Sequence, residues 1–185
     1  MKRLVWLAVV LAVVLTVNAA DAQEVKERGN NAVTMGAATN SATIGYWHKL
    51  NDDVSLGGDF TLYLRHHNDY VSQTYQFSPG IRYYLLPEKA VSPYCYGAII
   101  GRYGTTLDRG SDTKTRSESY TAGLQGGIGL EWFPTQRVSV AGHVGAIAQY
   151  EKNHSTTSGS FTGSSHDEGY TIGTISSGIL VNLYF

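Results

Sequence analysis

EGYTIGTISSGILVNLYF, the stretch from Glu168 to Phe185, ends the chain. Counted back from Phe185, every second residue as far as Ile175 is apolar apart from Ser177, and the residues between them are mostly small or polar. Successive side chains of a strand point to opposite faces, so the pattern predicts one long strand with one apolar face. Strands of soluble proteins usually have about 5–6 residues. By itself the stretch fits both a strand that crosses a membrane and the long last strand of a soluble sandwich.

The first 22 residues predict export. Lys2 and Arg3 form a basic head, residues 4–17 form an apolar core, and Ala20-Asp21-Ala22 is an A-x-A cleavage pattern. This is the pattern of a secretory signal peptide. The apolar core is too short for a transmembrane anchor, which needs about 20 residues.

The remainder of the chain is long enough for one domain. Removing residues 1–22 from the 185 leaves 163. We expect a short periplasmic tether at 23–30 and a single domain at 31–185. The formal net charge of −1 gives no indication of a nucleic-acid partner. Cys95 is the only cysteine, which excludes an internal disulfide framework.

Eight runs of alternating apolar and polar residues follow the tether. They lie at 31–38, 41–49, 54–66, 72–86, 92–105, 117–133, 138–151 and 168–185. Three short connections, at 50–53, 87–90 and 134–137, alternate with polar and mostly longer ones at 68–71, 106–116 and 152–167. Short turns at one end and long loops at the other are typical of outer-membrane barrels, with the turns in the periplasm. Aromatic residues near both ends of the runs, such as Tyr83 and Tyr103, agree with two interfacial girdles.

The alternation separates an apolar face from a polar face that carries glycines and charges. A lipocalin-like soluble barrel would turn the polar face outward, whereas a transmembrane barrel turns it inward. Only 16% of the residues are charged, which favours the transmembrane form. We therefore expect these apolar residues to face lipid: Leu56, Phe60, Leu62, Ile81, Leu124, Ile128, Leu130, Val140, Val144 and Val181.

Four segments carry a family resemblance: SPGIRYYLLP at 78–87, VSPYCYGAIIGRYG at 91–104, GLQGGIGLEWFPTQRVSV at 123–140 and GILVNLYF at 178–185. With them the chain resembles the small eight-stranded outer-membrane β-barrel domains related to the OmpA and OmpX barrels. The resemblance implies an all-β fold, an eight-stranded antiparallel up-and-down transmembrane β-barrel, in the outer membrane of a Gram-negative bacterium. It implies no cofactor, contact with outer-membrane lipid, and assembly by periplasmic chaperones and the barrel-insertion machinery, which reads the terminal Phe185.

We interpret the inward polar residues as a lumen network that fills a barrel too narrow for an aqueous channel. Its members are Asp59, Arg65, Arg82, Arg102, Gln125, Glu131 and His143. Arg82 is expected to pair with Asp59 or Glu131. Pro79 lacks a donor for the sheet and is expected to mark a bulge. Cys95 is expected to face lipid as an inert side chain.

We assign no catalytic, cofactor-binding or metal-binding residue. His66, His67 and Asp69, like His154 with the segment at 166–168, lack the regular spacing of a metal site. The favoured function is structural or surface-interacting, with exposed loops, chiefly at 152–167, open to an extracellular ligand. The alternative is a narrow pore or a carrier of small hydrophobic molecules. A lipid-modifying enzyme is a remote alternative, because the sequence has no His-x-Ser arrangement.

Overall fold

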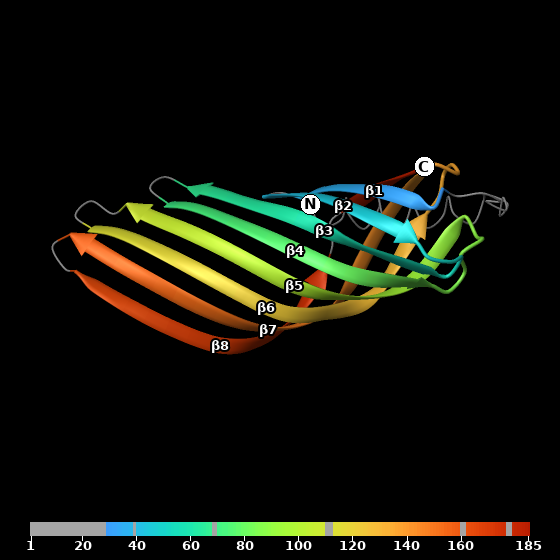
Figure 1. The fold of residues 1–185 in the computed structure, drawn as a ribbon. Coiled ribbons are helices and arrows are strands. Elements are labelled where there is room, and N and C mark those ends of the chain that lie inside the picture. Colours follow the sequence, from blue (N-terminus) through green and yellow to red (C-terminus); the bar gives the residue numbers. More distant parts are fainter. Residues whose placement is uncertain (1–28, 39, 68–69, 110–112, 160–161, 177–178) are drawn as a thin grey trace, which may run out of the picture.

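The computed structural model describes residues 29–38, 40–67, 70–109, 113–159, 162–176 and 179–185 (Figure 1). The predicted signal peptide and most of the predicted tether lie outside the described residues. The described residues form nine strands: β1 (Asn31–Ala38), β2 (Ser41–Lys49), β3 (Val54–His67), β4 (Tyr70–Tyr84), β5 (Val91–Arg109), β6 (Thr113–Trp132), β7 (Val138–Gly159), β8 (Gly163–Ser176) and β9 (Ile179–Tyr184). The described residues contain no helix that is long and apolar enough to cross a membrane.

The sheet closes on itself. Each strand from β1 to β7 pairs antiparallel with the next, and β9 pairs with both β1 and β7. β1 and β9 join through pairs that run from Ala32↔Tyr184 to Ala37↔Ile179. The last strand therefore pairs with the first, as the predicted eight-stranded up-and-down barrel requires, and the ring has eight strands. Closure leaves no unpaired edge within the ring, as a strand-built membrane span requires.

The last predicted strand is wrong in one respect, because residues 168–185 do not keep one register against β7. Both β8 and β9 pair with β7, but Val144 lies opposite Ser176 while Ala141 lies opposite Leu180. Three positions along β7 (144 to 141) thus correspond to four on the other side (176 to 180), so the register shifts by one. A one-residue shift moves side chains to the other face of a sheet.

The shift reverses which residues point inward. In β9 the even-numbered Leu180 and Asn182 are buried inside the ring. In β8 the odd-numbered Ile175 lines the internal cavity, and the even-numbered Ile172 is 84% exposed. The expectation that Ile175 shares a face with Val181 is therefore wrong.

The strands are strongly staggered around the ring. Starting at Tyr75 and following paired residues through β5, β6 and β7 leads to Glu168. Following them the other way, through β3, β2 and β1, leads to Ile179. These end points lie eleven positions apart (168 to 179), and such a stagger means that the strands are tilted against the barrel axis. β8 therefore continues the wall beyond the ring that β9 closes.

The predicted lipid face is the outer face of the ring. Seven of its members are exposed: Leu56, Phe60, Ile81, Leu124, Ile128, Leu130 and Val144. Leu62, Val140 and Val181 lie on the same face and are half-buried. Cys95 is also exposed on the outer face, as the alternation predicts.

Aromatic side chains form a row at each end of this apolar belt. At one end Tyr75, Tyr103 and Tyr120 are cross-strand neighbours, and the pair Tyr150 and Tyr170 continues the row with ring centroids 5.2 Å apart. At the other end Tyr46, Tyr83, Trp132 and Phe185 are exposed. The two predicted aromatic rows are therefore present, one at each end of the apolar belt, as in the girdles of outer-membrane barrels.

The short connections lie together at one end of the barrel, which we call the turn end (Figure 1). The turn at 50–53 has the predicted bounds, and Asn51 accepts hydrogen bonds from the backbone N–H groups of Asp53 and Val54. A hydrogen bond from Lys49, with the charge of its ammonium group, lowers the pKa of Asp52. The opposite end is called the outer end below.

The predicted long loops are largely strands. β5, β6, β7 and β8 run well past the tyrosine row, and Figure 1 shows them extending beyond the β1–β2 hairpin. Hydroxyl groups pair across this extension, as in Thr115 with Thr157 at 3.2 Å and Ser117 with Ser155 at 2.7 Å. Threonine favours strands, and such cross-strand pairs stabilise them. Polar composition alone was therefore a misleading sign of a loop.

Pro79 does not mark a bulge. The β4–β5 ladder pairs Phe77 with Gly101 and Gly80 with Ala98, so the register is unchanged across the proline. Ser78 and Pro79 have no paired residue in β5, while Pro79 remains paired with Gly58 of β3. The missing N–H interrupts the ladder without inserting a residue.

Candidate functional site: the polar lumen

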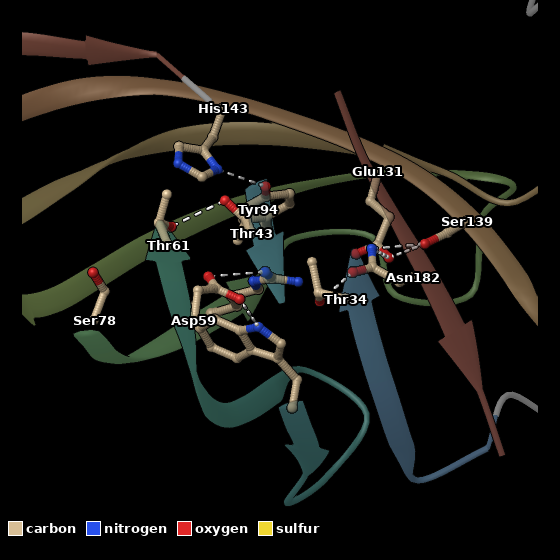
Figure 2. A network of polar contacts seen from close by, with 12 residues as sticks. Thr34, Thr43, Asp59, Thr61, Ser78, Tyr94, Glu131, Ser139, His143 and Asn182 are labelled. Carbon is tan, nitrogen blue, oxygen red and sulfur yellow. Dashed lines mark hydrogen bonds and ion pairs between the residues drawn. The ribbon is translucent and has the colours of Figure 1, made fainter. Parts of the chain in front are cut away.

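Glu131 is the centre of a hydrogen-bond network near the turn end of the lumen (Figure 2). Its carboxylate accepts hydrogen bonds from Tyr84 Oη at 2.7 Å, Asn182 Nδ2 at 2.7 Å and Tyr184 Oη at 2.8 Å. Ser139 Oγ donates to it as well. Glu131 is fully buried, at 0% exposure. A buried carboxylate is tolerated only when donors replace its hydration, and here four side chains do so.

The donors come from strands that are far apart in the chain. Tyr84 ends β4, Ser139 lies near the start of β7, and Asn182 and Tyr184 lie on β9. Each of them is on the inward face of its strand. Thr34 of β1 donates to Asn182 Oδ1, which connects the network to the first strand.

Arg82 forms a second cluster, further from the turn end. Its guanidinium carbon lies 3.8 Å from the centroid of the Trp47 ring and 5.6 Å from that of Tyr94. Its Nη2 is 3.9 Å from Asp59 Oδ2, and Trp47 Nε1 donates to Asp59 Oδ1 at 3.0 Å. Arg82 is only 2% exposed. Aromatic faces and a carboxylate together compensate for the buried charge.

The two clusters hold separate carboxylates. Sequence reasoning left the partner of Arg82 open between Asp59 and Glu131, and the ion pair goes to Asp59. Figure 2 shows Glu131 with Ser139, Asn182 and Thr34, and Asp59 apart from them. Glu131 is instead held by uncharged donors, which sequence reasoning did not anticipate.

The other predicted members of the lumen network lie in different surroundings. Arg102 donates to Gln76 Oε1 from Nε at 3.1 Å and from Nη2 at 2.7 Å. His143 stacks against Tyr96, with ring centroids 4.3 Å apart, and its Nδ1 lies 3.4 Å from Tyr94 Oη. Arg65 is exposed near the outer end of β3 and is not part of either cluster.

A cavity of about 400 Å³ lies beyond the Arg82 cluster, toward the outer end. Asp59, Arg102, Gln125 and His143 contribute to its lining. Other polar side chains complete most of the wall, and the large aliphatic residues in it are Ile147, Ile175 and Leu180. The lumen is thus packed near the turn end and hollow above it.

Comparison with solved structures identifies the architecture. A major outer membrane protein of Thermus thermophilus matches with a TM-score of 0.55 and 13% identity, over 84% of this chain and 98% of that one. This chain has the fold of a small outer-membrane β-barrel. The expectation drawn from the four sequence segments is confirmed for the fold.

Two further barrels match less closely in shape. The N-terminal β-barrel domain of Pseudomonas aeruginosa OprF gives a TM-score of 0.44 at 15% identity, over 86% of this chain and all of that one. Neisserial surface protein A gives 0.48 at 16% identity, over 84% and 93%. No family model matches the sequence, and neither does any curated protein.

Three residues that contact the buried charges were not predicted from the sequence. The two clusters are completed by Trp47, Tyr94 and Asn182. The only sign of them in the sequence is that the alternation puts each on the inward face of its strand. Local alternation can place a residue in the lumen but cannot say what it meets there.

Among the described residues, no group of three or more His, Cys, Asp or Glu side chains could hold a metal ion. His154 and His166 do lie opposite each other, with ring centroids 6.4 Å apart.

Proposed function

We propose that the chain is an outer-membrane protein of a Gram-negative bacterium with a structural or surface-interacting role and a non-conducting lumen. The observation that carries this proposal is the burial of Glu131 and Arg82 in two saturated clusters across the barrel. Eight strands leave an interior just wide enough for side chains. In this arrangement the charges hold the wall together and leave no path for ions.

The orientation follows from the asymmetry of the ends. Short turns face the periplasm and the extension of β5–β8 projects outside the cell, as in other barrels of this architecture. The exposed side chains on that extension provide the surface for a partner. We propose no enzymatic activity.

Conductance in planar bilayers tests the closed lumen. The refolded wild-type protein should give no steady conductance, whereas Glu131→Ala combined with Tyr84→Ala should raise leakage by removing two side chains from the plug. Large, stable channels from the wild-type protein would contradict the proposal and favour the pore. Purification from outer-membrane fractions, with electrophoresis before and after boiling, tests location and closure separately.

The cavity does not favour a carrier of hydrophobic molecules, because its lining is mostly polar. A narrow pore would need a route past Glu131, and the four hydrogen bonds to its carboxylate support a closed lumen instead.

Assembly is proposed to depend on Phe185. Its backbone continues the ladder with Asn31 through hydrogen bonds of 2.9 and 3.2 Å, while its side chain is exposed. We propose that periplasmic chaperones and the insertion machinery recognise this exposed ring during assembly. Phe185→Ala should therefore reduce the amount of folded protein in cells without reducing refolding from urea into detergent, and an equal loss in both would contradict it.

A further inference from the structure

The extension of β5–β8 beyond the tyrosine row has faces of opposite charge. Cross-strand pairs place residues of like orientation together, so the two faces can be read from the register. The inward face has the acidic residues Asp108, Glu151 and Asp167, and no lysine or arginine among its described residues. The outward face contains Arg109, Lys114, Arg116 and Lys152, with Glu118 and Glu168 as its acids. The excess of positive charge therefore lies on the outward face.

That outward face continues the apolar belt of the barrel. Lys152 lies directly opposite Tyr120 of the tyrosine row. Arg116 lies four residues further along β6, roughly 13 Å at the usual rise of a strand. Rings of an aromatic girdle sit at the level of the lipid headgroups, so Lys152 is at that level and Arg116 lies further out.

Two of these cations line a shallow depression of about 480 Å³. It is lined by Lys114, Arg116, Glu118, His154, Thr156 and Ser158. Arg116 is held by Glu118 at 2.9 Å and its side chain remains 67% exposed. Among the described residues, no acidic side chain forms an ion pair with Lys114 or Lys152. The ammonium group of Lys114, the guanidinium of Arg116 and two hydroxyls in this depression suit a phosphate group.

An apolar groove of about 450 Å³ lies directly below. Phe60, Phe77, Gly101 and Ala122 contribute to it, with rings of the tyrosine row, and Lys152 stands at its border. A side chain added at Gly101 would meet nothing within 4 Å, so the groove is open there. Lys152 borders the groove, and His154, two residues further along β7, lines the depression, so the groove and the depression adjoin on one surface.

We propose that this surface binds a phosphorylated glycolipid of the outer leaflet, with one phosphate on Lys114 and Arg116, a second on Lys152, and an acyl chain in the groove below. The proposal rests on the outer-membrane orientation given above. Charge complementarity selects the phosphate, and the adjoining groove selects a lipid over a free anion. The inward face, with acids only, offers no comparable site.

Native mass spectrometry of the barrel in neutral detergent can test this with three probes: bis-phosphorylated lipid A, dephosphorylated lipid A and inorganic pyrophosphate. Phosphorylated lipid A should bind most tightly, and its binding should weaken as salt rises. Replacing the three cations by glutamine (K114Q, R116Q and K152Q together) should weaken binding about 100-fold, at about fivefold for each cation near a charged surface. A matched variant, R65Q with K89Q and R137Q, removes the same charge elsewhere and should bind normally.

The groove has its own matched pair. Gly97 and Gly101 both lie on the outward face of β5, and both have open space at the Cβ position. Gly101→Phe should fill the groove and weaken lipid A binding severalfold, whereas Gly97→Phe, outside the groove, should not.

Equal binding of phosphorylated and dephosphorylated lipid A would overturn the proposal, and so would equal loss in the two triple variants. Pyrophosphate binding as tight as that of lipid A would assign the surface to free anions and reject the lipid. Each variant is first checked for heat-dependent migration. A wild-type protein without heat-dependent migration, or one absent from outer-membrane fractions, would contradict the proposed function. A folded barrel that binds lipid A equally well with and without phosphates would contradict only the lipid site.

Discussion

The side-chain amide of Asn182 donates a 2.7 Å hydrogen bond to Glu131, and this bond ties the last strand to β6 across the lumen. The two residues lie on strands that are not neighbours, since β7 separates them. Together with the bond from Thr34 to Asn182, it links β1, β9 and β6 through side chains. The seam where the barrel closes is thus stabilised from inside as well as by backbone pairing.

Removing the Glu131 carboxylate should destabilise the barrel strongly. In Glu131→Ala four donors lose their bond to the carboxylate, and three of them, Tyr84, Ser139 and Asn182, are buried. An unsatisfied buried group costs about 1–3 kcal/mol. We expect a loss of at least about 3 kcal/mol in the free energy of unfolding, measured by urea titration in lipid vesicles. Glu88→Ala, in an exposed turn, should change it by less than about 0.5 kcal/mol. Similar losses in both variants would contradict the role of the network.

Arg82 and Asp59 should behave as a coupled pair. Arg82→Met leaves the Asp59 charge stranded, and breaking a buried pair in this way typically costs about 3–5 kcal/mol. Adding Asp59→Asn removes the stranded charge and keeps an acceptor for Trp47, so the double variant should be more stable than Arg82→Met alone. Adding Glu131→Gln instead should give no such rescue. Rescue by Glu131→Gln would show that the wrong carboxylate has been paired with Arg82.

The two faces of β6 should tolerate charge differently. Leu124 is exposed on the outer face of the barrel, whereas Gln125 lines the cavity. Leu124→Arg should cost about 2–4 kcal/mol if it lies near the bilayer midplane, and Gln125→Arg much less. Folding titrations in vesicles can measure both. Equal tolerance would mean that the faces have been assigned wrongly.

The register shift between β8 and β9 predicts a change in labelling pattern. In a Cys95→Ser background, single cysteines at 172, 174, 181 and 183 should react with a lipid-soluble maleimide, and those at 175, 180 and 182 should be protected. The accessible positions are even in β8 and odd in β9 because one extra residue reverses the faces. A pattern that stays odd from 171 to 183 would mean that the last strand is continuous after all.

Sequence alone determined the alternation and therefore most of the barrel wall. β1, β2 and the turn between β2 and β3 have the predicted bounds, and the predicted lipid-facing residues are all on the outer face. The reason is physical: a strand has a fixed period of two, so each residue's face follows from its neighbours in the chain.

Tertiary structure decided what depends on residues far apart in the chain. The register shift between β8 and β9 depends on how each of them pairs with β7. The strands beyond the tyrosine row are stabilised by cross-strand pairs of hydroxyl side chains. The hydrogen-bond partners of Glu131 come from three other strands. Alternation within one segment contains no information about which segment lies across the lumen. Only closure of the ring brings Glu131 to Asn182 and Arg82 to Trp47.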